Sequence, residues 1–369
     1  MDIQWNDPDL PRLTIGRTAF AGWTALRVTR GIDRMAADFD ISVTEGTAGM
    51  VIPPFSPCTL SIGKDLVLTG YVDVRDPSYD ADMHLVHISG RSKTEDLIDC
   101  SPEITGGQFK GYSLDAIARA VCQPFGIGLV VQTEMGDGFD DATIERAETG
   151  YAFLERLCRL RGVLACDDAA GNLVLTRAGS QRAAGSLVEG QNIRRARAPI
   201  NVSKRFSKYI VRTQHGITAD VEDVVTDIEG IASDSGCPRY RPHACMGESQ
   251  MTQAEAQARA MWQAVFATAK GLQVEISVAG WRQSDGSLWQ ENQIILVVSP
   301  ALGLNRDLLV VSVSFEVSEH RGKMTHLTLG PVEGYTPNPA QVRLHRNKCG
   351  KGGKTKTNWD DVHGIKSGE

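Results

Sequence analysis

Two stretches of the chain decide the fold: VLTGYVDVRDPSYDADMHLVHI at residues 67–88 and LLVVSVSFEVSEHRGKMTHLTL at residues 308–329. In both, apolar and polar residues alternate on either side of a polar turn, as in a β-hairpin with one buried face. Laid over each other without a gap, they place Val72 on Val313, Val74 on Phe315, Met83 on Met324, Val86 on Leu327 and Ile88 on Leu329. Any two hairpins share this alternation, and two copies of one barrel predict it as well, so both explanations stay open.

Further strands are predicted around each of the two stretches. Residues 25–29 and 39–43 alternate, and a proline-rich connection (Pro53, Pro54, Pro57) leads to another short strand at 59–62. Residues 272–278 and 293–298 show the same character before the second stretch. Each region therefore predicts a small antiparallel sheet or barrel.

Helical periodicity appears between the two β regions. Ser113 is placed to cap a helix over 114–123, and Thr149 to cap a second helix that ends at Gly162. A hairpin over 163–176 follows, which predicts a compact α/β module. Further on, Thr252 and Glu255 have the spacing of a capping box and open an alanine-rich helix.

We therefore predict a β-rich α+β protein with two barrel-like domains flanking the α/β module. The expected boundaries are 1–95 for the first barrel, 96–195 for the module and 196–340 for the second barrel, with a helical insertion around 219–271. Residues 341–369 are rich in Gly, Lys and Asn and predict a flexible basic tail. Its basic residues are expected to be solvated, with DNA or an acidic partner surface as the alternative: Arg346, Lys348, Lys351, Lys354 and Lys356.

The composition argues against several classes of protein. The 369 residues carry a formal net charge of −6, which argues against a protein that coats nucleic acid. No apolar run approaches the ~20 residues that span a bilayer, and the first nine residues are polar, so we expect no stable membrane insertion and folding in the cytoplasm. The eight cysteines form no CxxC, which gives a disulfide framework or zinc ribbon little support: Cys58, Cys100, Cys122, Cys158, Cys166, Cys237, Cys245 and Cys349.

Three patterns resemble functional sites, but each fails on spacing or context. The run Gly350 to Thr355 lacks the first glycine of a phosphate-binding loop, because Lys348 stands there. Three ligand-type residues in one loop match no common zinc spacing: Cys237, His243 and Cys245. Neighbouring acids usually face water from turns: Asp140 with Asp141, Asp167 with Asp168, and Asp360 with Asp361. We therefore expect no cofactor, no metal and no catalytic residue.

The segment from Ile88 to Ser101, ISGRSKTEDLIDCS, resembles the baseplate hub proteins of Mu-like contractile-tailed phages, often labelled tail protein P or late control protein D. Three later segments agree in order: residues 114–127; the run FLERLC at 153–158 with Gly162 and GNL at 171–173; and Gly280-Trp281 with Leu288-Trp289. The resemblance covers nearly the whole chain to about Gly334. It extends to the N-terminal part of type VI secretion spike proteins, although this chain has no long spike-forming repeat.

The resemblance implies a structural protein and not an enzyme. It implies a homotrimer whose tail-tube-like barrels form a ring of pseudo-sixfold symmetry, built in the host cytoplasm and carried in the virion. The implied partners are the tail tube protein, a separate central spike protein and other baseplate proteins, with DNA only in transit through the lumen. Two alternatives remain: a peptidoglycan-degrading enzyme of the tail tip and a monomeric tail adaptor.

Three tryptophans are candidate anchors of the interface between subunits, because aromatic side chains dominate interface energetics: Trp262, Trp281 and Trp289. A role in filling barrel or helix cores is the alternative for each.

Overall fold

The computed structural model describes residues 7–44, 52–81, 84–179, 181–213, 228–246, 252–318 and 321–336. The first β unit contains seven strands: β1 (Pro11–Ile15), β2 (Thr18–Phe20), β3 (Ala25–Gly31), β4 (Asp38–Thr44), β5 (Pro57–Ile62), β6 (Asp65–Tyr79) and β7 (His84–Ser92). Their order across the sheet is β3-β4-β7-β6-β5-β1-β2. Alternate residues of each strand point into one core, as the sequence pattern predicts.

The second β unit repeats this strand order. It contains β13 (Gln181–Val188), β14 (Ile193–Arg197), β18 (Val274–Ala279), β19 (Gln293–Ser299), β20 (Leu304–Ser318) and β21 (Gly322–Gly330). Across the sheet they run β14-β18-β21-β20-β19-β13, which is the order of β3-β4-β7-β6-β5-β1 both in space and along the chain. The internal repeat is therefore confirmed in strand order, although β1 pairs antiparallel with β5 whereas its counterpart β13 pairs parallel with β19.

The ungapped alignment of the two stretches, however, is in the wrong register. A β-bulge interrupts the β6–β7 ladder at Asp73, and its counterpart in the β20–β21 ladder is at Val311. Matching the bulges places Val72 on Val310 and not on Val313. The first strands are thus three residues out of register, and the second strands two, because Gly90 pairs with Val72 and Leu329 with Val310. Alternation does not distinguish registers that differ by two residues, and in β20 the consecutive buried residues Leu308 to Val311 at the bulge hide the additional one.

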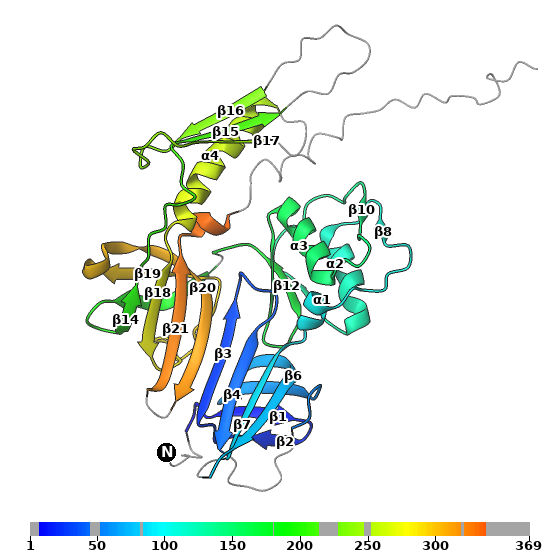
Figure 1. Ribbon diagram of the computed structural model, residues 1–369, viewed down its shortest axis with the longest axis vertical. Helices are drawn as coiled ribbons and strands as arrows, with labels where there is room; N and C mark the ends of the chain where they lie inside the picture. The colour runs from blue at the N-terminus through cyan, green and yellow to red at the C-terminus, as the bar shows by residue number, and fades with distance from the viewer. Residues whose placement is uncertain are drawn as a thin grey trace, which may run out of the picture.

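Neither unit closes into a barrel, which corrects the prediction of two barrels. The β3 edge that could return to its own unit pairs instead with β20 of the other unit. The result is a single 13-stranded sheet that folds over one shared hydrophobic core (Figure 1). The two β units are thus joined edge to edge within one chain.

The α/β module lies beside the first unit and has its own core. It contains α1 (Glu95–Asp99), β8 (Gln108–Phe109), α2 (Leu114–Cys122), β9 (Leu129–Val131), β10 (Ala142–Thr143), α3 (Gly150–Arg161), β11 (Leu164–Asp167) and β12 (Leu173–Thr176). The Thr149 hydroxyl caps α3 by accepting from the Ala152 amide, and Gly162 ends it with a φ of 61°. Both ends of this helix and the β11–β12 hairpin are confirmed.

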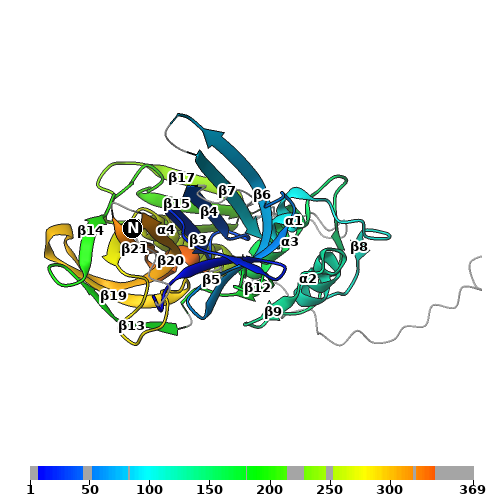
Figure 2. The same ribbon diagram turned by 90° about the horizontal axis from the view of Figure 1, so that it is seen from below.

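The insertion between β14 and β18 is a sheet covered by a helix, and not helical alone as predicted. It contains β15 (Lys208–Thr213), β16 (Ile228–Ser233), β17 (Pro242–Met246) and α4 (Gln253–Lys270), and the predicted capping box of Thr252 and Glu255 is present. The insertion and the α/β module lie at the same end of the long sheet, and the C-terminal ends of β6 and β20 lie at the other (Figure 1). Figure 2 shows the β6–β7 hairpin projecting from the body of the chain.

Three 3-10 turns complete the described elements: Gln123–Phe125, Pro300–Leu302 and Val332–Tyr335. Among the described residues, no helix has the length and apolar character needed to cross a membrane. The predicted tail at 341–369 lies outside the described residues. The predicted boundaries at 95, 195 and 340 stay predictions.

Candidate assembly surface

The pairing of β3 with β20, which we call the intrachain junction, is the contact that unites the two β units. Its antiparallel register runs from Ser312 opposite Gly31 to Ser318 opposite Ala25. One edge of β20 pairs with β21 at residues 309–318, whereas the other edge is divided between β19 at residues 304–309 and β3 at residues 312–318. The long strand therefore belongs to two neighbouring sheets at once.

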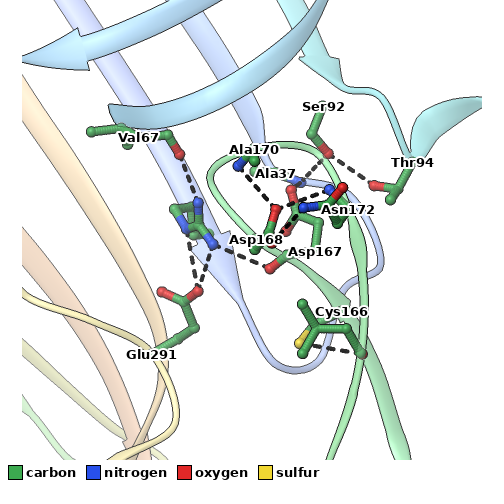
Figure 3. Close-up of polar contacts among 12 residues, drawn as sticks. Ala37, Val67, Ser92, Thr94, Cys166, Asp167, Asp168, Ala170, Asn172 and Glu291 are labelled. Atoms are coloured by element: carbon green, nitrogen blue, oxygen red, sulfur yellow. Dashed lines mark hydrogen bonds and ion pairs between the residues drawn. The ribbon is translucent and has the colours of Figure 1, made fainter. Parts of the chain in front are cut away.

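A buried arginine lies at the inner end of the intrachain junction, and Figure 3 labels three of its partners, Val67, Asp167 and Glu291. Arg30 of β3 is 8% exposed, and its guanidinium donates to the carbonyls of Val67 and Asp167 and to the Glu291 carboxylate. The N–O distance to Glu291 is 2.8 Å. Its partners come from the first β unit, the α/β module and the second β unit, so one side chain joins three parts of the chain.

The electrostatics of this cluster keep Arg30 charged. Burial acts to lower the pKa of Arg30, but the charges of Glu291 and Asp167 outweigh burial and raise the pKa above its ordinary value. Burial likewise raises the pKa of Asp167, and the positive charge of Arg30 opposes that rise. Because Arg30 is buried and bound by three parts of the chain, it holds these parts in position and offers no reactive group.

Several sheet edges are unpaired among the described residues, including those of β2 and β13, and two others correspond to the strands of the intrachain junction. The outer edge of β14 is the one that faces away from its partner β18. The outer edge of β6 is formed by residues 74–79, which extend beyond the end of β5 and pair only with β7. In the repeat, β14 corresponds to β3 and β6 corresponds to β20. These two edges are therefore the counterparts of the two strands that form the intrachain junction.

The two outer edges differ in chemistry. β14 carries three exposed arginines, at 194, 195 and 197. Residues 74–79 of β6 carry Arg75 as well as exposed Asp76, and Asp80 follows directly, so residues 74–80 have a net charge of −1. The exposed apolar side chains of this edge are Val74 at 45% and Tyr79 at 82%. Unpaired strands with opposite net charge and exposed apolar groups are suited to pairing with another chain.

Of the three candidate tryptophans, two lie inside the chain. Trp281 is 1% exposed and donates to the Glu316 and Met324 carbonyls, and Trp289 is 6% exposed in the same core. Core filling, the alternative kept open for them, accounts for both. Trp262 on α4 is half-buried, stacks on Phe266 and donates to the Thr336 carbonyl. An anchoring role for Trp262 stays a prediction.

The remaining candidate groups have separate surroundings. The Cys237 thiol faces the Arg239 carbonyl, His243 stacks on Phe206, and Cys245 contacts Gln263. In the described part of the chain, no three His, Cys, Asp or Glu side chains gather as a metal site would require.

The paired acids also diverge. Asp167 accepts from the Ala37 amide within the buried cluster, whereas Asp168 accepts from Ala170 and Asn172 in the adjoining turn (Figure 3). Asp141 contacts Gln108 and Thr143. Asp360, Asp361 and the run Gly350 to Thr355 lie outside the described residues.

Sequence reasoning missed Arg30, Phe55 and Ile200. Arg30 had a signal, since it follows Leu26 and Val28 on the buried face of an alternating strand, where a charge requires a partner. Phe55 and Ile200 are exposed at 89% and 73%, and an exposed apolar residue in a loop carries no distinct sequence pattern.

Three family models match the chain in order. Residues 12–92 match the N-terminal domain of the Mu phage baseplate assembly protein GpP-like family. Residues 94–177 match the second domain of the baseplate hub protein gp44-like family, and residues 252–338 match the fourth domain of Mu phage baseplate assembly protein GpP. The baseplate hub protein gp44 of Escherichia phage Mu is 36% identical over 330 residues, which is 86% of each chain.

The chain belongs to the Mu baseplate hub protein family. As a member of this family it is a structural protein of the phage tail baseplate, and it is not an enzyme. The resemblance found in the sequence is confirmed.

Solved structures agree with this hub family. The 43 kDa tail protein of prophage MuSo2 from Shewanella oneidensis is 33% identical, with a TM-score of 0.81 over 89% of this chain and 100% of that chain. The tail protein of Neisseria meningitidis MC58 has a TM-score of 0.75 at 20% identity, covering 89% of this chain and 98% of that one. A type VI secretion component of E. coli shares the fold, with a TM-score of 0.55 at 12% identity over 89% and 80% of the two chains.

Proposed function

We propose that three copies of this hub chain close into a ring of six β units that joins the tail tube to the central spike and lets DNA pass. The observation that carries this proposal is the pair of unpaired outer edges. The intrachain junction pairs β3 with β20, and their counterparts in the repeat, β14 and residues 74–79 of β6, each have an edge with no strand beside it in the described chain. Repeating the junction between copies joins β14 of one chain to β6 of its neighbour.

The register of this contact between copies follows from the repeat. Paired residues run in one row through Leu26, Ile41, Ile88 and Arg75 in the first unit, and through Ala196, Ile276, Leu327 and Val313 in the second. Arg75 and Val313 both lie two residues past their bulges, so the rows correspond. Val317 pairs with Leu26 at the intrachain junction, and its counterpart is therefore Tyr79 of one copy opposite Ala196 of the next.

A contact between two different edges is heterologous, so repeated application leads to a ring when the rotation closes. Three copies carry six β units, which matches a sixfold tube on one side and a threefold spike on the other. The face of the long sheet that points away from the core is polar, with residues such as Asp40, Ser277 and His326, and suits a water-filled lumen for DNA in transit.

The two ends of the long sheet suit different partners. The C-terminal ends of β6 and β20 correspond in the repeat and lie at one end, which fits the tail tube. The α/β module and the insertion differ from each other and lie at the other end, which fits a threefold spike and further baseplate proteins (Figure 1). Assembly of free chains in the host cytoplasm precedes incorporation into the virion.

Light scattering on the purified full chain tests the ring. We expect a mass of three chains, and a persistent mass of one chain at micromolar concentration would instead support the monomeric adaptor. The double variant Tyr79→Cys/Ala196→Cys should form covalent trimers on oxidation, because paired strand residues lie within reach of a disulfide. The matched control Tyr79→Cys/Leu160→Cys, with its second cysteine on α3, should not.

A further inference from the structure

Phe55 and Asn292 occupy the same place in the two β units. Both are non-glycine residues with a left-handed backbone, at φ values of 65° and 64°. The Phe55 amide donates to the Val72 carbonyl, and the Asn292 amide donates to the Val310 carbonyl, which is the position that the bulges match to Val72. Such a conformation is unfavourable for a bulky residue, so its presence points to a role for the side chain.

In the second unit, this position serves the intrachain junction. The residue before Asn292 is Glu291, which binds Arg30 of β3. The Asn292 side chain accepts from the Gly179 amide and donates to the Arg177 carbonyl. The left-handed turn thus directs Glu291 across the junction, while Asn292 binds the connection between β12 and β13.

In the first unit, the corresponding turn has nothing comparable to contact within the described chain. Pro54 and Phe55 take the places of Glu291 and Asn292, and Phe55 is 89% exposed. Prolines at 53, 54 and 57 restrict the backbone on both sides, so the aromatic ring is held in position before any partner arrives.

The counterpart of Arg30 at the outer edge of β14 is also apolar. Arg30 lies four residues beyond Leu26, and Ile200 lies four residues beyond its match Ala196, with Ile200 still in register opposite Leu272. Ile200 is 73% exposed, and Val202 two residues later is 48% exposed. Arg30 and Glu291, which form the polar contact at the intrachain junction, are thus replaced by the exposed apolar residues Ile200 and Pro54.

We propose that Phe55 of one hub chain packs on Ile200 and Val202 of the next, at the place that the Arg30–Glu291 pair occupies within each chain. This inference rests on the proposed ring and specifies the contact that closes it. The partner is a second copy of this chain. An aromatic ring held ready by proline and buried against two aliphatic side chains is the composition expected of an interface hot spot.

Sedimentation velocity over a range of concentrations tests the contact. Phe55→Ser and Ile200→Ser should each raise the concentration for half-assembly at least tenfold, with no loss of the monomer's thermal unfolding midpoint. Leu160→Ser removes a comparably apolar residue, 39% exposed on α3, and should leave assembly unchanged. The double variant Phe55→Ser/Ile200→Ser should be little worse than either single variant, because both remove the same contact.

The outcomes separate this inference from the proposed function. If the wild-type chain stays a monomer, the ring itself is refuted. If the wild type forms trimers and Phe55→Ser assembles equally well, the ring stands and the Phe55 contact is refuted. The pair Phe55→Cys/Ile200→Cys adds a readout that does not depend on affinity: oxidation should give covalent trimers, and trimers that never crosslink would contradict the contact.

Discussion

The intrachain junction and its proposed counterpart between copies use the same strands of the repeat but different chemistry. Within the chain, β3 meets β20 around the buried, charged Arg30 and Glu291. At the outer edges, the corresponding positions hold exposed Ile200 and Pro54, and exposed Phe55 follows Pro54 in the place of Asn292. A junction that forms during folding has its partners tethered nearby, so it can bury a charge with a fixed set of acceptors. A junction between separate copies must remain soluble beforehand and gain free energy on contact, which favours apolar burial and complementary surface charge.

The bulge residues show the same contrast. Val311, at the bulge of β20, is 1% exposed. Its counterpart in β6 is Asp73, which forms an ion pair with Arg91 and hydrogen-bonds the Glu95 carboxyl. The intrachain bulge is therefore apolar and insensitive to pH, whereas the bulge next to the outer edge of β6 contains groups that titrate.

The largest expected effect is at the intrachain junction. Arg30→Met should lower the free energy of unfolding by about 3 to 5 kcal/mol, because Glu291 and the Asp167 carbonyl lose their buried donor. Urea denaturation followed by circular dichroism measures this loss. Arg27→Met, which removes an exposed arginine from the same strand, should change it by less than about 0.5 kcal/mol.

A second variant decides whether Arg30 acts through its charge. Arg30→Met/Glu291→Leu removes both ions, so it should regain part of the loss seen in Arg30→Met. If Arg30→Met alone is as stable as the wild type, the buried pair is not what holds the two β units together.

A smaller effect is expected at the β6 bulge and depends on pH. Burial, aided by the negative charge of Asp73, raises the pKa of Glu95 from 4.5 to about 8, although Arg91 acts against the rise. Because the folded chain favours the protonated acid, the stability it contributes is present below pH 4.5 and is lost as the pH rises through about 8. Glu95→Gln keeps a neutral group at all pH values, so it should be more stable than the wild type at pH 9 by about 2 kcal/mol.

Unfolding free energies of the wild type and Glu95→Gln between pH 5 and 9 check this expectation. The difference between the two proteins should grow with pH. Glu103→Gln, at an exposed position in the α/β module, should follow the wild type throughout. A constant difference between wild type and Glu95→Gln would show that Glu95 does not titrate differently in the folded chain.

The smallest expected effect concerns charge at the outer edge of β14. Arg195→Glu/Arg197→Glu should weaken assembly about tenfold at low ionic strength, because it places acids opposite the edge that carries Asp76. The deficit should shrink in 0.5 M salt, which screens exposed charges. Arg146→Glu, exposed in the α/β module, is the control, and adding Asp76→Lys to the double variant should restore assembly. Equal weakening by Arg146→Glu would indicate an effect of net charge alone.

Local features of the fold could be predicted from the sequence because they depend on nearby residues. The hairpins follow from alternation, and α3 and α4 begin where Thr149 and Thr252 provide capping oxygens. The strand order of the repeat was suggested by the two matching stretches. Their register was not, because the consecutive apolar residues Leu308 to Val311 at the bulge of β20 allow apolar matches in more than one register.

The junctions could not be predicted because they depend on contacts between distant segments. Thr29 and Ser314, which share a hydrogen bond across the intrachain junction, are 285 residues apart in the chain. Alternation along β3 shows which face is buried but not which strand lies at its edge. For the same reason the barrels predicted from the pattern are open in the structure, with Phe55 and Ile200 recognisable only once the strands are placed.

The insertion between β14 and β18 affects the order in which the strands of the hub chain can pair during synthesis. β14 has its ladder partner only after the whole insertion has left the ribosome, since β18 follows it, whereas β6 gains β7 within a few residues. Closing so long a loop is slow compared with forming a hairpin. We therefore expect the arginine-bearing strand to gain its ladder partner late in synthesis, after the β6–β7 hairpin has formed.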